Sequence, residues 1–339
     1  MKSSSILLSI VAAVTMTFGV STSAVQAQVC AGDVNGDHVV DSTDLAILLG
    51  NWGNCPGPTW ATVLEWAPDC AVVTNVTLRD AITASGLPWR VRDNGTGIEM
   101  LLVPAGTFMM GCSASTQYGC GSDESPTHQV TLPQAFYMGR YEVTQAEWTA
   151  KMGSNPSFFV SANGYSSGTR KPVEQVSWNM IASTGGFMRV TGLRLPTEAE
   201  WEYAYRAGAT TAFHSYSEQP TGFNDDTLLG NIGWYSGNNG ALGSSTYGTK
   251  AVGGKLANGL GLHDMAGNVS EWCQDWYGPY SSGSVTNPTG PTTGTYRVLR
   301  GGFWGGDSNF CRASWRNSNS PDVIIDYGFT GGFRAARNP

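Results

Sequence analysis

Charged residues are scarce in this sequence. Lys, Arg, Asp and Glu make up 13% of the 339 residues, and the formal net charge is −7. Lys and Arg form no cluster, which excludes a basic nucleic-acid-binding surface as the expected function. Beyond residue 27 no apolar stretch is long enough to cross a membrane, since a spanning helix needs about 20 apolar residues. No pair of cysteines has the CxxC spacing, so nothing favours a zinc finger or a thioredoxin-like motif.

Glycine and aromatic residues are abundant. The chain has 44 Gly, 12 Trp, 13 Tyr and 12 Phe. The glycines, together with many uncharged polar residues, favour a loop-rich protein. The aromatic side chains supply enough apolar area for a packed core, which argues against disorder. At about 150 residues per domain, the length allows roughly two domains.

The first 27 residues are typical of a secretory signal peptide. Lys2 supplies the positive start, Ile6–Val14 is an apolar run, and Val25–Ala27 offers small residues before a cleavage site. We therefore expect residues 1–27 to be removed and the mature protein to be secreted and soluble. A membrane anchor is the alternative, although the apolar run is shorter than a membrane span. All seven cysteines lie after residue 27, and export favours disulfides for most of them.

Residues 28–56 contain oxygen-bearing side chains at the spacing of a twelve-residue calcium loop. The expected ligands are Asp33, Asn35, Asp37, the Val39 carbonyl, Asp41 and Asp44. His38 at the sixth position and Asp44 at the twelfth, where Gly and Glu are usual, predict a weakened affinity. Cys30 and Cys55 flank the loop, and we expect them to form a disulfide. The segment resembles one repeat of a type I dockerin, which implies a small EF-hand-like loop and a cohesin-like partner; an acidic turn without metal is the alternative.

Residues 57–98 are punctuated by prolines and are predicted to be a linker, with one helical stretch at 76–82. From Glu99 onward, short apolar runs alternate with Gly, Asn and Pro turns. Strands are expected on both sides of a turn within 99–111, and again at 129–132 and 135–138. Capping boxes at Thr144–Glu147 and Thr197–Glu200 predict helices that end at Gly153 and before Gly208, and a third helix is expected from Ser177.

Ordered motifs across residues 99–337 resemble the formylglycine-generating enzyme family, also called sulfatase-modifying factor. The motifs are Glu142–Thr144, Lys171–Trp178, Arg194–Ala204, Gly259–Trp272, Arg297–Gly302 and Gly332–Arg334. The resemblance implies an α+β, C-type-lectin-like fold with little regular secondary structure. Folds of this kind often bind calcium.

Active members of this family oxidise a cysteine of a sulfatase to formylglycine with molecular oxygen, using Cu(I) held by two cysteines. Soft thiolates select Cu(I), and the metal supplies oxygen chemistry that side chains lack. Here Cys311 matches the second cysteine, whereas the first position is Gly306. Cys311 is therefore a catalytic candidate, with Cu(I) as cofactor, only if the protein is active. We expect Cys311 to form a disulfide with Cys273 instead.

A second disulfide and a calcium site are also expected in this domain. Cys112 and Cys120 lie in one Gly/Ser-rich loop and are predicted to pair. The family's calcium ligands match Asp264, the Gly267 and Val269 carbonyls, and Glu271. The alternative is that both carboxylates cap turns without metal. A second family site is degraded here: Asn231 and Ile232 match its first two ligands, but Ser244 stands near the acidic one.

The sequence is compatible with three functions. The first is a binding module for a protein or glycan, because the C-terminal stretch also resembles the variable, ligand-binding region of diversified lectin-fold proteins. Aromatic and Asn side chains suit such a surface. The expected contacts are Phe303, Trp304, Asp307, Asn309, Phe310 and Asn317. The second is an oxidase with altered copper ligation, and the third is a structural surface protein attached through the dockerin-like repeat.

Overall fold

The computed structural model describes residues 57–112, 118–165, 168, 170–324 and 331–339. The chain divides into two units, of which the second comprises Pro56–Pro68 and Val72–Pro339. The fold below is that of the second unit. The predicted signal peptide 1–27, the calcium loop 33–44, and Cys30 and Cys55 lie outside the described residues.

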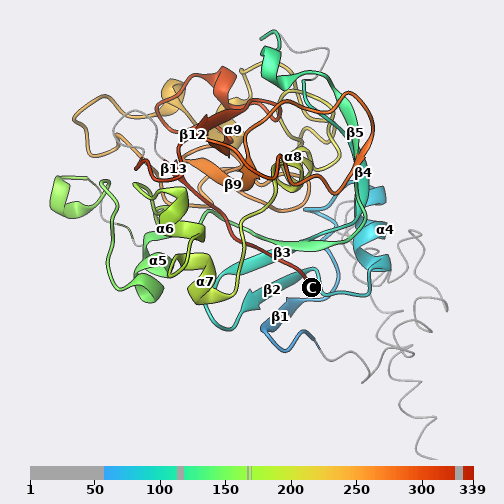
Figure 1. Ribbon diagram of the computed structural model, residues 1–339, viewed down its shortest axis with the longest axis horizontal. Coiled ribbons are helices and arrows are strands. Elements are labelled where there is room, and N and C mark those ends of the chain that lie inside the picture. The colour runs from blue at the N-terminus through green and yellow to red at the C-terminus, as the bar shows by residue number, and fades with distance from the viewer. Residues whose placement is uncertain (1–56, 113–117, 166–167, 169, 325–330) are drawn as a thin grey trace, which may run out of the picture. The chain divides into compact units, whose positions relative to one another are not determined.

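A five-stranded sheet has the order β1-β2-β3-β6-β14, and Figure 1 labels its first three strands. Its strands are β1 (Ala61–Glu65), β2 (Arg90–Asp93), β3 (Glu99–Val103), β6 (Phe136–Gly139) and β14 (Ala336–Arg337). Every neighbouring pair is antiparallel. β3 lies at the centre, and its residues from Met100 to Val103 are all buried. The two edge strands of this sheet are therefore β1, near the start of the described residues, and β14, near their end.

The prediction that residues 57–98 form a linker is wrong. This segment supplies β1, β2 and the helix α4 (Val76–Ala84), which confirms the helical stretch expected at 76–82. α4 begins after Asn75, whose side chain accepts a hydrogen bond from the Leu78 amide. β1 is an edge strand, a place where flanking prolines are tolerated, so they do not break the sheet.

Three further sheets complete the fold of this unit. β4 (Gly106–Met110), β5 (His128–Leu132) and β10 (Val285–Thr286) form one sheet, in which β10 runs parallel to β5. β12 (Asn317–Asn319), β11 (Arg297–Arg300), β9 (Ser270–Trp276) and β13 (Gly331–Gly332) form another, in that order. β7 (Gly233–Trp234) and β8 (Ala266–Gly267) pair in parallel.

Both helices predicted from capping boxes are confirmed. α5 (Gln145–Met152) follows Thr144 and stops at Gly153, which has a φ of 78°. α8 (Glu198–Arg206) follows Thr197 and ends at Ala207 in the left-handed region. The helix expected from Ser177 is short, because α6 (Trp178–Ala182) stops before the two glycines, and α7 (Phe187–Thr191) follows them. The remaining helical turns are α9 (Leu229–Ile232) and the 3-10 turns η1 (Ser122–Glu124), η2 (Ser161–Asn163), η3 (Ser236–Asn238) and η4 (Ser308–Cys311).

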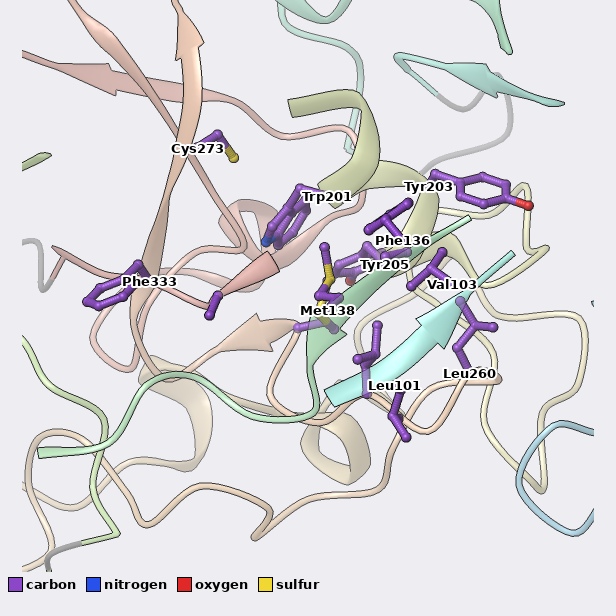
Figure 2. Close-up of a cluster of buried hydrophobic side chains, with 14 of the residues drawn as sticks. Leu101, Val103, Phe136, Met138, Trp201, Tyr203, Tyr205, Leu260, Cys273 and Phe333 are labelled. Atoms are coloured by element: carbon purple, nitrogen blue, oxygen red, sulfur yellow. The ribbon is translucent and has the colours of Figure 1, made fainter. Parts of the chain in front are cut away.

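The core is built around α8. Every residue of this helix is buried, so it is covered on all sides. Trp201 and Tyr205 lie in the same apolar cluster as Met138 of β6 and Phe333 (Figure 2). The mixed helix and strand content confirms the predicted α+β class. This packing holds the C-terminal stretch against α8, which positions the candidate site.

Candidate functional site

The segment that contains Gly306 and Cys311 turns sharply after β11. Gly301 and Gly302 have φ angles of 92° and 74°, and a Cβ on Gly302 would lie 2.8 Å from the Phe310 carbonyl oxygen. Only glycine fits this left-handed, crowded turn. The chain then reaches η4, whose last residue is Cys311. The Tyr205 hydroxyl donates a hydrogen bond of 2.6 Å to the Cys311 carbonyl, which anchors η4 on α8.

The surroundings of Cys311 do not fit a two-thiolate Cu(I) site. The side chain is fully buried, and burial, assisted by the charge of Asp307, raises the pKa of its thiol to about 12. At Gly306, a Cβ would lie 2.8 Å from the Phe303 ring and 2.9 Å from the Phe310 ring. The two rings therefore fill the space that a cysteine at this position would need. One soft ligand is missing and the other is held as a thiol.

The predicted disulfide between Cys273 and Cys311 is wrong, since both are buried free thiols. The two side chains have different surroundings. Cys273 lies on β9 near Glu198, Asp275 and Arg300, whereas the charged neighbour of Cys311 is Asp307. Two cysteines in different motifs of one domain form a disulfide only where their Cα and Cβ atoms lie at the required distances.

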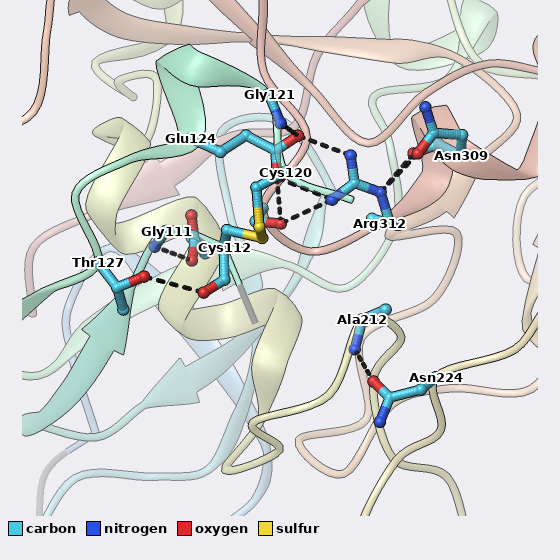
Figure 3. Close-up of a disulfide and its surroundings, with 12 residues drawn as sticks. Gly111, Cys112, Cys120, Gly121, Glu124, Thr127, Ala212, Asn224, Asn309 and Arg312 are labelled. Carbon is cyan, nitrogen blue, oxygen red and sulfur yellow. Dashed lines mark hydrogen bonds and ion pairs between the residues drawn. A yellow bond between two sulfur atoms is a disulfide. The ribbon is translucent and has the colours of Figure 1, made fainter. Parts of the chain in front are cut away.

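The predicted disulfide between Cys112 and Cys120 is confirmed, with a Cα–Cα distance of 5.7 Å (Figure 3). Cys70 is also disulfide-bonded. Beside the Cys112–Cys120 bridge, Glu124 accepts hydrogen bonds of 2.7 and 2.6 Å from the two terminal nitrogens of Arg312. This fork joins the disulfide loop to the chain directly after Cys311.

The Arg-Gly-Gly motif has a structural role in this protein. Arg300 is completely buried and forms an ion pair with Glu202 of α8. Its guanidinium also donates hydrogen bonds to three carbonyls, those of Ala313, Ser314 and Trp315. Glu202 of α8 and Arg300 thus fix the backbone of residues 313–315, which follow Cys311.

The six predicted binding residues fall into two groups. Phe303 and Trp304 are buried, at 5% and 3% exposure, and belong to the core rather than to a ligand surface. Asp307 is exposed, and Asn309, Phe310 and Asn317 are half-buried. The Phe310 ring also packs on Trp315 at 5.0 Å. The structure therefore leaves a smaller surface than the sequence suggested, centred on η4 and β12.

Three buried carboxyl groups, those of Glu142, Asp264 and Glu271, interact with one another. Glu271 forms an ion pair with Arg334 and accepts a hydrogen bond of 2.7 Å from the Trp201 indole. One oxygen of Asp264 accepts from the Gly253 amide at 2.6 Å, while the other, Oδ1, is buried without a partner in the described part of the chain. Glu142, which sequence reasoning did not single out, accepts from the Asn268 side chain and the Val269 amide. Its place in the Glu142–Thr144 motif was the available signal.

The electrostatics of this cluster raise the pKa values of two of its carboxyl groups. Burial, together with Asp264 and Glu271, raises the pKa of Glu142 well above its usual value. Burial also raises the pKa of Asp264 to about 6, although hydrogen bonding and Arg334 oppose this. The charge of Arg334 acts on all three carboxyl groups, and the charges of Arg170 and Lys255 also act on Asp264. Within the described ranges, no group of three or more His, Cys, Asp or Glu side chains is arranged to hold a metal.

The residues that were matched to a second calcium site make other contacts. The Asn231 side chain donates to the Tyr216 hydroxyl at 3.2 Å, and Ile232 is buried. Ser244 is bonded to Thr246. The ammonium of Lys255 donates to the neighbouring Gly230 carbonyl and stacks over Trp234. A lysine next to Asn231 and Ile232 disfavours a second cation at this position.

Comparison with known proteins identifies the domain. Residues 87–339 match the sulfatase-modifying factor enzyme 1-like domain. The chain belongs to this family. It is 31% identical over 266 residues to the serine/threonine-protein kinase pkn1 of Chlamydia pneumoniae. This match covers 71% of this chain and 38% of the kinase. It is 33% identical over 226 residues to the formylglycine-generating enzyme of Thermomonospora curvata. This match covers 63% of this chain and 68% of that enzyme.

The fold is also similar to that of a solved structure. Treponema denticola variable protein 1 superimposes with a TM-score of 0.58 and 30% identity, over 71% of this chain and 95% of that one. The chain spans 38% of the length of the chlamydial kinase, so the match concerns only part of that protein. Among the described residues, no helix has the length and apolar character that a membrane crossing requires.

Proposed function

We propose that this sulfatase-modifying-factor-like protein is a catalytically degenerate, calcium-stabilised binding module. The observation that carries the proposal is at Gly306: the first copper cysteine is absent, and two aromatic rings occupy its place. The buried thiol of Cys311, with a pKa raised to about 12, adds to this argument. A copper site that activates oxygen needs an accessible thiolate pair.

The C-terminal surface supports binding of a protein or glycan. Asp307 is exposed, and Asn309, Phe310 and Asn317 present amide and aromatic groups at partial exposure. Behind them, Arg300 and Arg312 lock the backbone through buried ion pairs, so the surface is rigid before a partner arrives. Pre-organisation lowers the entropic cost of association. The similarity to a Treponema denticola protein named as variable is consistent with this use of the fold.

The calcium of this proposal lies at Asp264. The unpartnered Oδ1 supplies one hard oxygen, and the carbonyls of Gly267 and Val269 complete the set that the family pattern indicates. Glu271 fits less well, because Arg334 already engages both of its oxygens. Calcium bound here would tie the loop after Asp264 to β9 and so stabilise the folded state.

The proposed setting is outside the cell. A signal peptide at residues 1–27 would direct export, and the dockerin-like repeat at residues 28–56 would attach the domain to a cohesin-like partner or bind calcium alone. The disulfide between Cys112 and Cys120 is consistent with an oxidising compartment.

A Cu(I) titration against a chromophoric Cu(I) chelator tests the proposal. The wild-type protein and Cys311→Ser should compete equally poorly, because the thiol is not available. In Gly306→Cys/Phe310→Ser the second ligand is restored and one ring is removed, so copper binding should appear and should require Cys311. Stoichiometric copper on the wild type that is lost in Cys311→Ser would instead support the alternative, an oxidase with altered ligation.

A further inference from the structure

A cavity of about 240 Å³ lies between the start of α8, the end of β9 and the loop that follows it. Its base is formed by the buried residues His128, Glu198 and Asp275, and its rim by exposed residues of the 279–290 loop. Neither Gly306 nor Cys311 lines it. The cavity is therefore separate from the segment that contains these two residues.

At the base of the cavity, Glu198 and Arg316 form an ion pair with each other. Glu198 accepts hydrogen bonds of 2.6 and 2.8 Å from Arg316, and a third of 3.1 Å from the Tyr280 hydroxyl. The remaining nitrogen of Arg316 donates to the Asp123 and Gly278 carbonyls. All three nitrogens of this guanidinium are thus engaged, and its charge is balanced by Glu198.

Two buried side chains at the base, Asp275 and His128, each have a hydrogen-bond acceptor atom to which no described residue donates. Asp275 is 3% exposed; its Oδ2 accepts from the Glu198 amide at 3.0 Å, whereas Oδ1 has no partner in the described part of the chain. His128 is 5% exposed, and its Nδ1 lies 3.0 Å from the Pro126 carbonyl oxygen. Because a carbonyl only accepts, Nδ1 carries the hydrogen, and Nε2 of the neutral ring is an acceptor. No other described residue bonds this Nε2.

The walls of the cavity are largely apolar and offer few hydrogen-bond donors. Met110, Ala199 and Val285 are apolar, and the lining prolines, Pro279, Pro288 and Pro291, have no amide hydrogen to donate. Burial, together with the charge of Glu198, raises the pKa of Asp275 to about 8. A carboxyl that is costly to ionise alone gains most from a cation beside it.

We infer that this cavity binds the primary ammonium group of a small alkyl amine, with Asp275 Oδ1 and His128 Nε2 as acceptors and the apolar walls around the alkyl stem. The ammonium has three donors and no acceptor, which complements a base that offers acceptors. Two sources share this chemistry: a lysine side chain and a free amine.

Isothermal titration of the full chain with n-butylammonium chloride tests the inference. We expect saturable binding of one equivalent, with n-butanol binding at least about tenfold more weakly, since a charge-assisted hydrogen bond is lost. Nα-acetyl-lysine methylamide distinguishes the sources: binding as tight as that of n-butylammonium favours a peptide lysine, and exclusion favours a free amine.

Asp275→Asn is the matched variant, because its amide oxygen still accepts from the Glu198 amide and preserves the start of α8. It should weaken binding at least about tenfold, while Asp225→Asn on an exposed turn should leave it unchanged. His128→Phe keeps a ring against Tyr280 and should also weaken binding. Equal affinity for n-butanol, an unchanged affinity in both cavity variants, or no saturable heat would each overturn the inference.

Discussion

The ion pair between Glu124 and Arg312 allows the sharpest stability prediction. Both side chains are buried, and their forked contact links the disulfide loop to the segment after Cys311 (Figure 3). Ser314 donates a further hydrogen bond of 2.7 Å to the same carboxylate. Glu124→Gln preserves the shape of the side chain and removes its charge, so Arg312 is left buried without a counter-charge.

The expected cost follows from that burial. Removing one partner of a buried ion pair destabilises a protein by about 3–5 kcal/mol. For a domain of this size, each kcal/mol lowers the melting temperature by roughly 2–4 °C, which gives a decrease of about 6–20 °C. Although burial alone would raise it, hydrogen bonding from Arg312 and Ser314 holds the pKa of Glu124 below its usual value. The pair therefore contributes fully at pH 7 and is lost only as the pH falls through the acidic range.

Thermal unfolding at pH 7, followed by circular dichroism, measures this effect. Glu218→Gln, an exposed glutamate, is the control and should leave the melting temperature unchanged. In Glu124→Gln/Arg312→Met the unpaired charge is absent, so part of the loss should be recovered. A decrease below about 2 °C in Glu124→Gln, against the estimate for a buried pair, would refute the reasoning.

Three further predictions concern calcium, the thiols and pH. A chelator should lower the melting temperature of the wild type by more than that of Asp264→Ala; equal shifts would place the metal elsewhere. Iodoacetamide should modify Cys273 and Cys311 only after denaturation, as peptide mapping would reveal; a recovered Cys273–Cys311 crosslink would contradict the free thiols. Between about pH 5 and 8 the folded Asp275 holds a proton that the unfolded chain has released, because its pKa is raised to about 8, so the free energy of unfolding should fall as pH rises. Asp275→Asn should flatten that part of the pH profile measured by urea unfolding.

Local signals in the sequence predicted local structure well. The capping boxes at Thr144 and Thr197 identified α5 and α8, because a cap involves residues only three positions apart. The disulfide between Cys112 and Cys120 joins residues separated by 8 positions, so it too could be expected. The position of Gly306 was visible in the family pattern without a structure.

Features that depend on distant contacts were not predictable in the same way. β1 joins the sheet only through pairing with β2, and no periodicity within residues 57–68 reveals that partner. The separate surroundings of Cys273 and Cys311 depend on how β9 and η4 pack around α8. Phe303 and Trp304 looked like a ligand surface, but the folding of residues 301–311 turns both into the core.

The absence of oxidase activity is the central claim, and one measurement tests it most directly. The purified protein is incubated with Cu(I), oxygen and a peptide that carries a sulfatase-type cysteine, and the peptide is followed by mass spectrometry. The Thermomonospora curvata formylglycine-generating enzyme serves as the positive control. We predict that the peptide cysteine stays unconverted while the control converts it. Formation of the aldehyde product by the wild type, lost in Cys311→Ser, would contradict the account.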